Sequence, residues 1–318
     1  MITSEIQAAK STFCQLVNDD AHKAIIDLLV SLRSRLALST DDVGWALWNI
    51  CDRYAILRNA KQQYVYQSEF YEWGKTTLPA LRLHWVVSDG TQALTLIDGG
   101  FLDFWWNCYQ FANKRVPIAA ENRTVRFESH RANAAAYTHF REFSRAESAL
   151  QLLETVLSED QIWVNRDFAI VTYHTLLVEF YDALEQREQV SRQIDNLDIY
   201  LGDWLSRFKL PKVMSAEPIL GSWDQLNAGR PAETIFVAID NAACAFAIAK
   251  QFVGAERLFR ICLDQCPERM TAYCKALYLL ACWQNRRSPD EIRSLLHGFQ
   301  NLTVQQVIKF APELKDVI

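Results

Sequence analysis

Cysteines, histidines and a band of arginines beside aromatic residues are the side chains in this sequence best suited to chemistry. Cys262 and Cys266 are four residues apart, so they share one face of a helix and could chelate a metal ion together with Cys274. None of the eight cysteines forms a C-x-x-C pair. In a reducing compartment such cysteines are mostly small core residues. We therefore predict no metal and no cofactor.

Catalytic signatures are missing from the sequence. It has no G-x-S-x-G, no P-loop, no G-x-G-x-x-G and no H-E-x-x-H. The six histidines are scattered, and His174 is predicted to be a buried histidine with a satisfied hydrogen bond. We predict no catalytic residues and favour a protein that is not an enzyme. An all-α enzyme with an interior pocket stays an alternative, because such sites assemble from distant residues.

The second candidate site is a basic and aromatic band at residues 104–145. Between residues 112 and 145, basic residues outnumber acidic ones by four. Aromatic rings beside arginines could hold bases, so an RNA- or nucleotide-binding helical protein is another alternative. A solvated helix face with core aromatics explains the same residues. The candidate residues for an anionic ligand are Arg115, Arg123, Arg126, Arg141, Arg145, Trp105 and Trp106.

Composition indicates that helices position these side chains. The chain has 318 residues, of which half are hydrophobic and 22% charged, so it is globular. Ten glycines and eight prolines are too few for the turns of an all-β protein of this size. The formal net charge of −5 argues against a dedicated nucleic-acid binder. We predict an all-α fold.

Two stretches, Ala134 to Ser158 and Ala243 to Pro267, share one spacing pattern at an offset of 109 residues. Each has an aromatic residue, then a second aromatic, then a small residue and bulky residues: Tyr137, Phe143, Ala146, Leu150 and Leu153 in the first, Phe246, Phe252, Ala255, Phe259 and Cys262 in the second. This pattern resembles the tetratricopeptide repeat. The resemblance implies stacked antiparallel helical hairpins forming a right-handed α-solenoid. It places Ala146 and Ala255 where paired helices cross most closely.

The resemblance also implies a concave groove lined by the first helix of each hairpin. Its candidate lining is Glu128, Arg131, Thr138 and His139 in the first copy, and Val237, Asp240, Cys244 and Ile248 in the second. The second set is mostly apolar with one acid, which suits a hydrophobic helix or an extended peptide. We therefore expect a non-catalytic adaptor or regulatory protein that binds a peptide or a partner protein.

Four segments are predicted along the chain. They are divergent N-terminal hairpins at 1–120, a repeat-like region at 121–208, a connector containing proline and glycine at 209–230, and repeat-like hairpins with a capping helix at 231–318. Ser288 followed by Pro289 predicts a late helix start. The sequence lacks a signal-peptide pattern and an apolar run of roughly 20 residues, so we expect no membrane association and a cytoplasmic protein. Its oligomeric state stays open.

Overall fold

A computed structural model describes residues 2–19, 21–57, 59–78, 83, 86–88, 90–91, 102–116, 118, 122–159, 166–207, 231–265, 270–299 and 302–318. These residues lie almost entirely in helices, and they contain no β-strand. The all-α prediction is therefore confirmed for the described part of the chain. The predicted connector at 209–230 lies outside it, so the four predicted segments stay a prediction.

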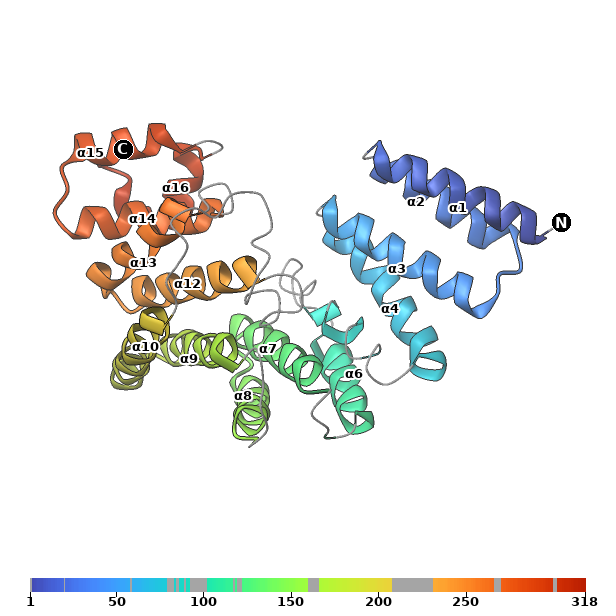
Figure 1. Cartoon of the computed structure of the whole chain (residues 1–318), viewed down its shortest axis with the longest axis horizontal. Coiled ribbons are helices and arrows are strands. Elements are labelled where there is room, and N and C mark those ends of the chain that lie inside the picture. The colour runs from blue at the N-terminus through green and yellow to red at the C-terminus, as the bar shows by residue number, and fades with distance from the viewer. Residues whose placement is uncertain are drawn as a thin grey trace. The chain divides into compact units, whose positions relative to one another are not determined.

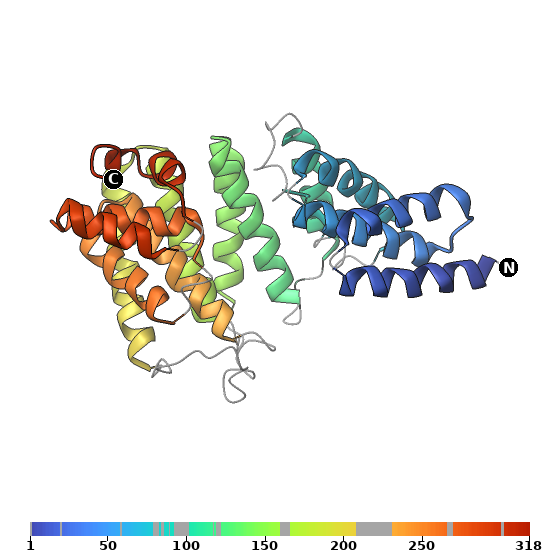
Figure 2. The same ribbon diagram turned by 90° about the horizontal axis from the view of Figure 1, so that it is seen from above.

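The chain divides into two compact units, Met1–Val156 and Leu157–Ile318. In the first unit, consecutive helices pack against each other from α1 to α4, drawn in blue in Figure 2. Trp105 and Tyr109 are fully buried in a core between α3, α4 and α6. The helices of this unit are α1 (Ile2–Asn18), α2 (His22–Arg35), α3 (Thr40–Ile56), α4 (Ala60–Thr77), α6 (Leu102–Arg115), α7 (Arg123–His139) and α8 (Phe143–Leu157).

In the second unit, helices pair in the order of the sequence, α9 with α10 and α12 with α13 (Figure 1). The first helices of successive pairs also lie against each other, because α12 contacts both α9 and α14. One continuous core runs through these elements. They are α9 (Arg166–Ala183), α10 (Arg187–Arg207), α12 (Pro231–Ile248), α13 (Phe252–Gln265), α14 (Ala272–Gln284), α15 (Pro289–Gly298), α16 (Val304–Phe310) and the 3-10 helix η3 (Pro312–Leu314).

Within the described residues, one kind of turn joins the helices of the α7–α8, α9–α10, α12–α13 and α14–α15 hairpins. Its central residue has a left-handed φ, and the next backbone N–H donates to the carbonyl five positions earlier. The central residue's own N–H donates three positions back, which completes a Schellman motif. Within the described ranges, these are also the non-glycine residues with positive φ: Arg141 (59°), Glu185 (60°), Lys250 (60°) and Arg286 (69°).

The two stretches that share a sequence pattern each contain this turn. Arg141 and Lys250 are 109 residues apart, the same offset as the aromatic and small residues. Between them, the described residues contain one further turn of this kind, at Glu185. The sequence pattern therefore marks two members of a larger set of equivalent hairpins.

The small residues that the pattern places at helix crossings are buried, as a close crossing requires. Ala146 and Ala255 are both fully buried. The corresponding positions of the other two hairpins are Val190 in α10 and Ile292 in α15, and these are buried as well. A small residue is thus not required at every crossing, which is why the alanine pattern found only two hairpins.

The first turn of α13 packs closely against the end of α12. A Cβ atom added to Gly254 would lie 2.3 Å from Cδ1 of Phe246, whose ring is 4% exposed. In the first copy the equivalent pair is Arg145 and Tyr137, where the guanidinium lies 5.7 Å from the ring centroid. The aromatic residue that ends the first helix therefore contacts the same position of the second helix in both copies.

Polar contacts join the α12–α13 hairpin to the turn between α14 and α15. Glu256 of α13 accepts hydrogen bonds from Asn285, at 2.7 Å, and from Arg287. Burial alone would raise the pKa of the Glu256 carboxyl, but these two hydrogen bonds outweigh it and lower the pKa below its ordinary value. The turn itself leads into α15, where Ser288 caps the helix and Pro289 occupies its first position, as predicted.

Candidate functional site

The predicted groove residues of the second unit lie on α12, in the layer of first helices formed with α9 and α14. Val237 is 42% exposed, and Ile248 is half-buried against the core. Asp240 and Cys244 are buried, at 9% and 7% exposure. The two buried residues are four positions apart, so they lie on one face of the helix.

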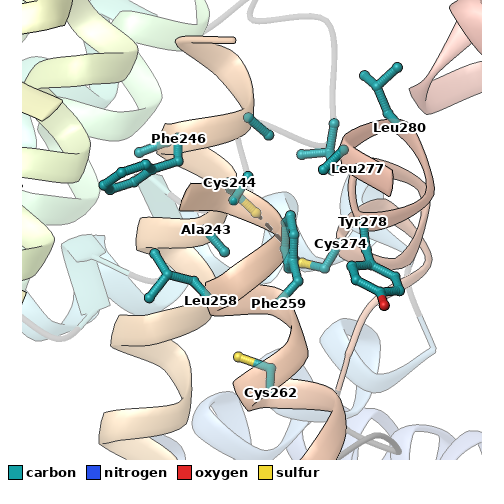
Figure 3. Packing of buried hydrophobic residues seen from close by; sticks show 14 of the residues in the cluster. Ala243, Cys244, Phe246, Leu258, Phe259, Cys262, Cys274, Leu277, Tyr278 and Leu280 are labelled. Atoms are coloured by element: carbon teal, nitrogen blue, oxygen red, sulfur yellow. Dashed lines mark hydrogen bonds between the residues drawn. The ribbon is translucent and has the colours of Figure 1, made fainter. Parts of the chain in front are cut away.

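Asp240 and Cys244 face the first turn of α14, where they meet Cys274. The sulfur atoms of Cys244 and Cys274 are 3.8 Å apart (Figure 3). The Cys274 thiol donates a hydrogen bond of 3.0 Å to Oδ2 of Asp240. The three possible ligand atoms all lie within 4.8 Å of one another, and all three residues are buried.

Helix capping holds Cys274 in this place. The Thr271 hydroxyl precedes α14 and accepts a hydrogen bond from the Cys274 backbone N–H, at 3.2 Å. The same hydroxyl lies 3.1 Å from the Cys274 sulfur, to which it can donate. Thr271 therefore fixes both the helix start and the position of the thiol.

The electrostatics of the cluster are those of an acidic site inside the protein. Burial raises the pKa of Asp240, although the Cys274 hydrogen bond works against this. The pKa of Cys244 is raised by its hydrogen bond with Cys274, by burial, and by the nearby negative charges of Asp240 and Glu179. Burial also raises the pKa of Tyr273, and the nearby Cys244, Glu179 and Cys274 add to this rise. Each of these groups is therefore pushed toward its neutral, protonated form.

The predicted groove residues of the first copy belong to the other unit. Glu128 and Arg131 pair with each other at 2.7 Å, one turn apart on α7. Thr138 is buried, while His139 is exposed at the end of the helix. Whether these residues share one groove with those on α12 stays a prediction.

Several residues of the predicted anionic-ligand band are inside the first unit. Trp105 is fully buried, and Arg123 and Arg126 are 1% and 5% exposed. Trp106 is half-buried and its ring contacts Tyr137, with centroids 5.1 Å apart. These four residues pack within the helical structure, as the core interpretation of the aromatics proposes.

The other arginines of the band lie nearer the surface. Arg115 donates to the backbone carbonyl of Lys75 at 2.7 Å. Arg145 pairs with Asp103, and Arg141 lies 5.9 Å from the ring centroid of Phe143. Binding of nucleic acid through this band stays untested.

The remaining candidates for chemistry are two cysteines and His174. Cys262 is buried on α13, and Cys266, the second cysteine of the trio considered for metal binding, lies outside the described residues. His174 donates from Nδ1 to Gln193 at 2.9 Å, and burial lowers its pKa. The predicted hydrogen bond is confirmed, whereas the His174 side chain is half-buried rather than buried.

Cys274 was missed as a partner of Asp240 and Cys244. It follows Cys244 by 30 residues, and another helix lies between them in the sequence. The sequence around Cys274 offers one signal. Thr271, three residues earlier, is typical of a helix N-cap. That pattern locates a helix start but does not indicate which helix it will contact.

No protein-family model matches this sequence, and no curated protein matches it at a significant level. No helix in the described ranges is long and apolar enough to cross a membrane.

Proposed function

We propose that this protein is a non-catalytic adaptor or regulatory protein that binds a segment of a partner protein. The binding surface is the layer of first helices in the second unit. The observation that carries this proposal is the contact of α12 with both α9 and α14, since it sets the first helices of successive hairpins side by side. In tetratricopeptide-like arrays, which these hairpins resemble, that layer lines the concave face.

The side chains exposed on this layer suit an apolar peptide. Val237 of α12 is 42% exposed, and Tyr273 at the start of α14 is 38% exposed. Exposed apolar side chains on the first helices offer anchoring contacts to a partner. An extended segment or an amphipathic helix with apolar anchors fits such a surface.

Nucleic-acid binding receives less support from the geometry. Trp105, Arg123 and Arg126 are buried, so the surface part of the basic band is smaller than its composition indicates. Arg145 is also engaged by Asp103. We therefore rank a protein partner above RNA.

A matched pair of substitutions tests the proposal. Peptides are selected from a phage-displayed random library on the full chain, and their dissociation constants are measured by titration calorimetry. Val237→Asp should weaken binding by about tenfold or more, because a charge replaces an apolar contact worth about 1.4 kcal/mol. Val253→Asp changes a residue of α13 that is 77% exposed and should leave binding within about twofold of the wild type.

Thermal melts by circular dichroism establish that both variants fold. If Val237→Asp binds the selected peptides as well as Val253→Asp does, the first-helix face is not the binding surface. If no peptide is selected, and RNA binds with a steep salt dependence that Arg115→Glu removes, the nucleic-acid alternative replaces this proposal.

A further inference from the structure

The Asp240 carboxylate is buried without full hydrogen bonding. Its Oδ2 accepts the Cys274 thiol, but Oδ1 is inaccessible to water and has no hydrogen-bond partner. An unsatisfied buried oxygen of this kind is costly and calls for an explanation. Two thiols beside it, from Cys244 and Cys274, complete a set of sulfur and oxygen donors that zinc prefers in proteins.

The spacing of the donors fits tetrahedral coordination. With zinc–sulfur bonds of about 2.3 Å, two sulfur ligands of a tetrahedral site lie about 3.8 Å apart, and the two sulfurs here are 3.8 Å apart. The distance of 3.0 Å from the Cys274 sulfur to Oδ2 would have to open to about 3.5 Å in such a site. This sulfur–oxygen distance is expected to lengthen, because a metal ion would take the place of the proton that the Cys274 thiol shares with the Asp240 carboxylate.

We propose that Asp240, Cys244 and Cys274 form a binding site for one Zn²⁺ ion. Binding displaces the thiol protons of both cysteines to solvent, together with the carboxyl proton where Asp240 is protonated, and forms two zinc–sulfur bonds and one zinc–oxygen bond. No electron is transferred. The three ligands leave one tetrahedral position for a water molecule.

The site would connect two hairpins. Asp240 and Cys244 belong to α12 of one hairpin, while Cys274 belongs to α14 of the next. Zinc binding would therefore hold two first helices together, independently of any peptide bound on their surface. This inference does not depend on the proposed function.

Metal content and metal titration test the site on the full chain. Reduced protein is purified without chelator and its zinc is counted by mass spectrometry, and the metal-free protein is then titrated with Co²⁺ alone. The expected result is one ion per chain, a sulfur-to-cobalt charge-transfer band that Zn²⁺ abolishes, and a higher melting temperature with Zn²⁺.

Three variants locate the ion. Cys274→Ala should lose the charge-transfer band, while Cys282→Ala, which removes a buried cysteine of the same helix, should keep it. Asp240→Asn preserves the shape of the side chain and should weaken zinc binding by more than about tenfold. Circular dichroism of each metal-free variant checks that it is folded.

Three outcomes would overturn the proposal. The first is a reduced wild-type chain that binds neither ion. The second is equal loss of cobalt binding in folded Cys274→Ala and Cys282→Ala. The third is a disulfide between Cys244 and Cys274 in the protein from the cell, detected by the mass of the linked peptides, because it would consume both sulfur ligands.

Discussion

Replacing Gly254 with alanine tests how closely α12 and α13 approach. In an open helix this change stabilises by about 1 kcal/mol, because alanine has the higher helix propensity. Here the new Cβ would lie 2.3 Å from Cδ1 and 2.6 Å from Cε1 of Phe246. That ring is 4% exposed and packed in the core, so it cannot turn away freely. Overpacking of this kind costs about 1–3 kcal/mol, and we expect a net loss of about 1 kcal/mol.

Two controls separate the effect of the clash with Phe246 from the effect of alanine's helix propensity. Gly202 lies in α10 with no atom within 4 Å of its added Cβ, so Gly202→Ala should stabilise the protein by about 1 kcal/mol. In a Phe246→Leu background the ring is gone, and Gly254→Ala should then stabilise by a similar amount. Unfolding free energies come from urea denaturation followed by circular dichroism. If Gly254→Ala stabilises the wild-type chain as much as Gly202→Ala does, the proposed close approach is absent.

Three further predictions concern the turns and the buried polar contacts. Lys250→Gly should stabilise by about 1 kcal/mol in urea denaturation, because glycine adopts the left-handed φ of 60° without strain; Lys275→Gly, within helix α14, should destabilise by about 1 kcal/mol. Glu256→Gln should cost about 1 kcal/mol at neutral pH. Because the folded pKa of Glu256 lies below its ordinary value of 4.5, the wild-type advantage is complete above about that pH and disappears as pH falls through the folded pKa, which melts at several pH values will show. Tyr109→Phe removes a buried hydrogen bond of 2.8 Å to a histidine and should lower the unfolding free energy by about 1–2 kcal/mol; an unchanged value would mean that this contact is not formed.

The sequence alone determined the helices and two of the hairpins. The scarcity of glycine and proline indicates helices, and Ser288 followed by Pro289 indicates a helix start. Both signals depend on composition or on adjacent residues, so they can be recognised without knowledge of the fold. The repeated aromatic and alanine positions found the hairpins turning at Arg141 and Lys250. The hairpin that turns at Glu185 does not show this pattern, because Val190 takes the place of alanine in its second helix.

Only the tertiary structure decided which side chains are buried and which distant residues meet. Arg123 and Arg126 belong to a basic stretch that composition places on the surface, yet the packing of α7 buries them. Cys274 reaches Asp240 and Cys244 because α14 packs on α12 as well as on α13, its neighbour in the sequence. Those contacts depend on how whole hairpins pack, and the packing is set by the summed apolar contacts of many residues, which no short stretch of sequence encodes.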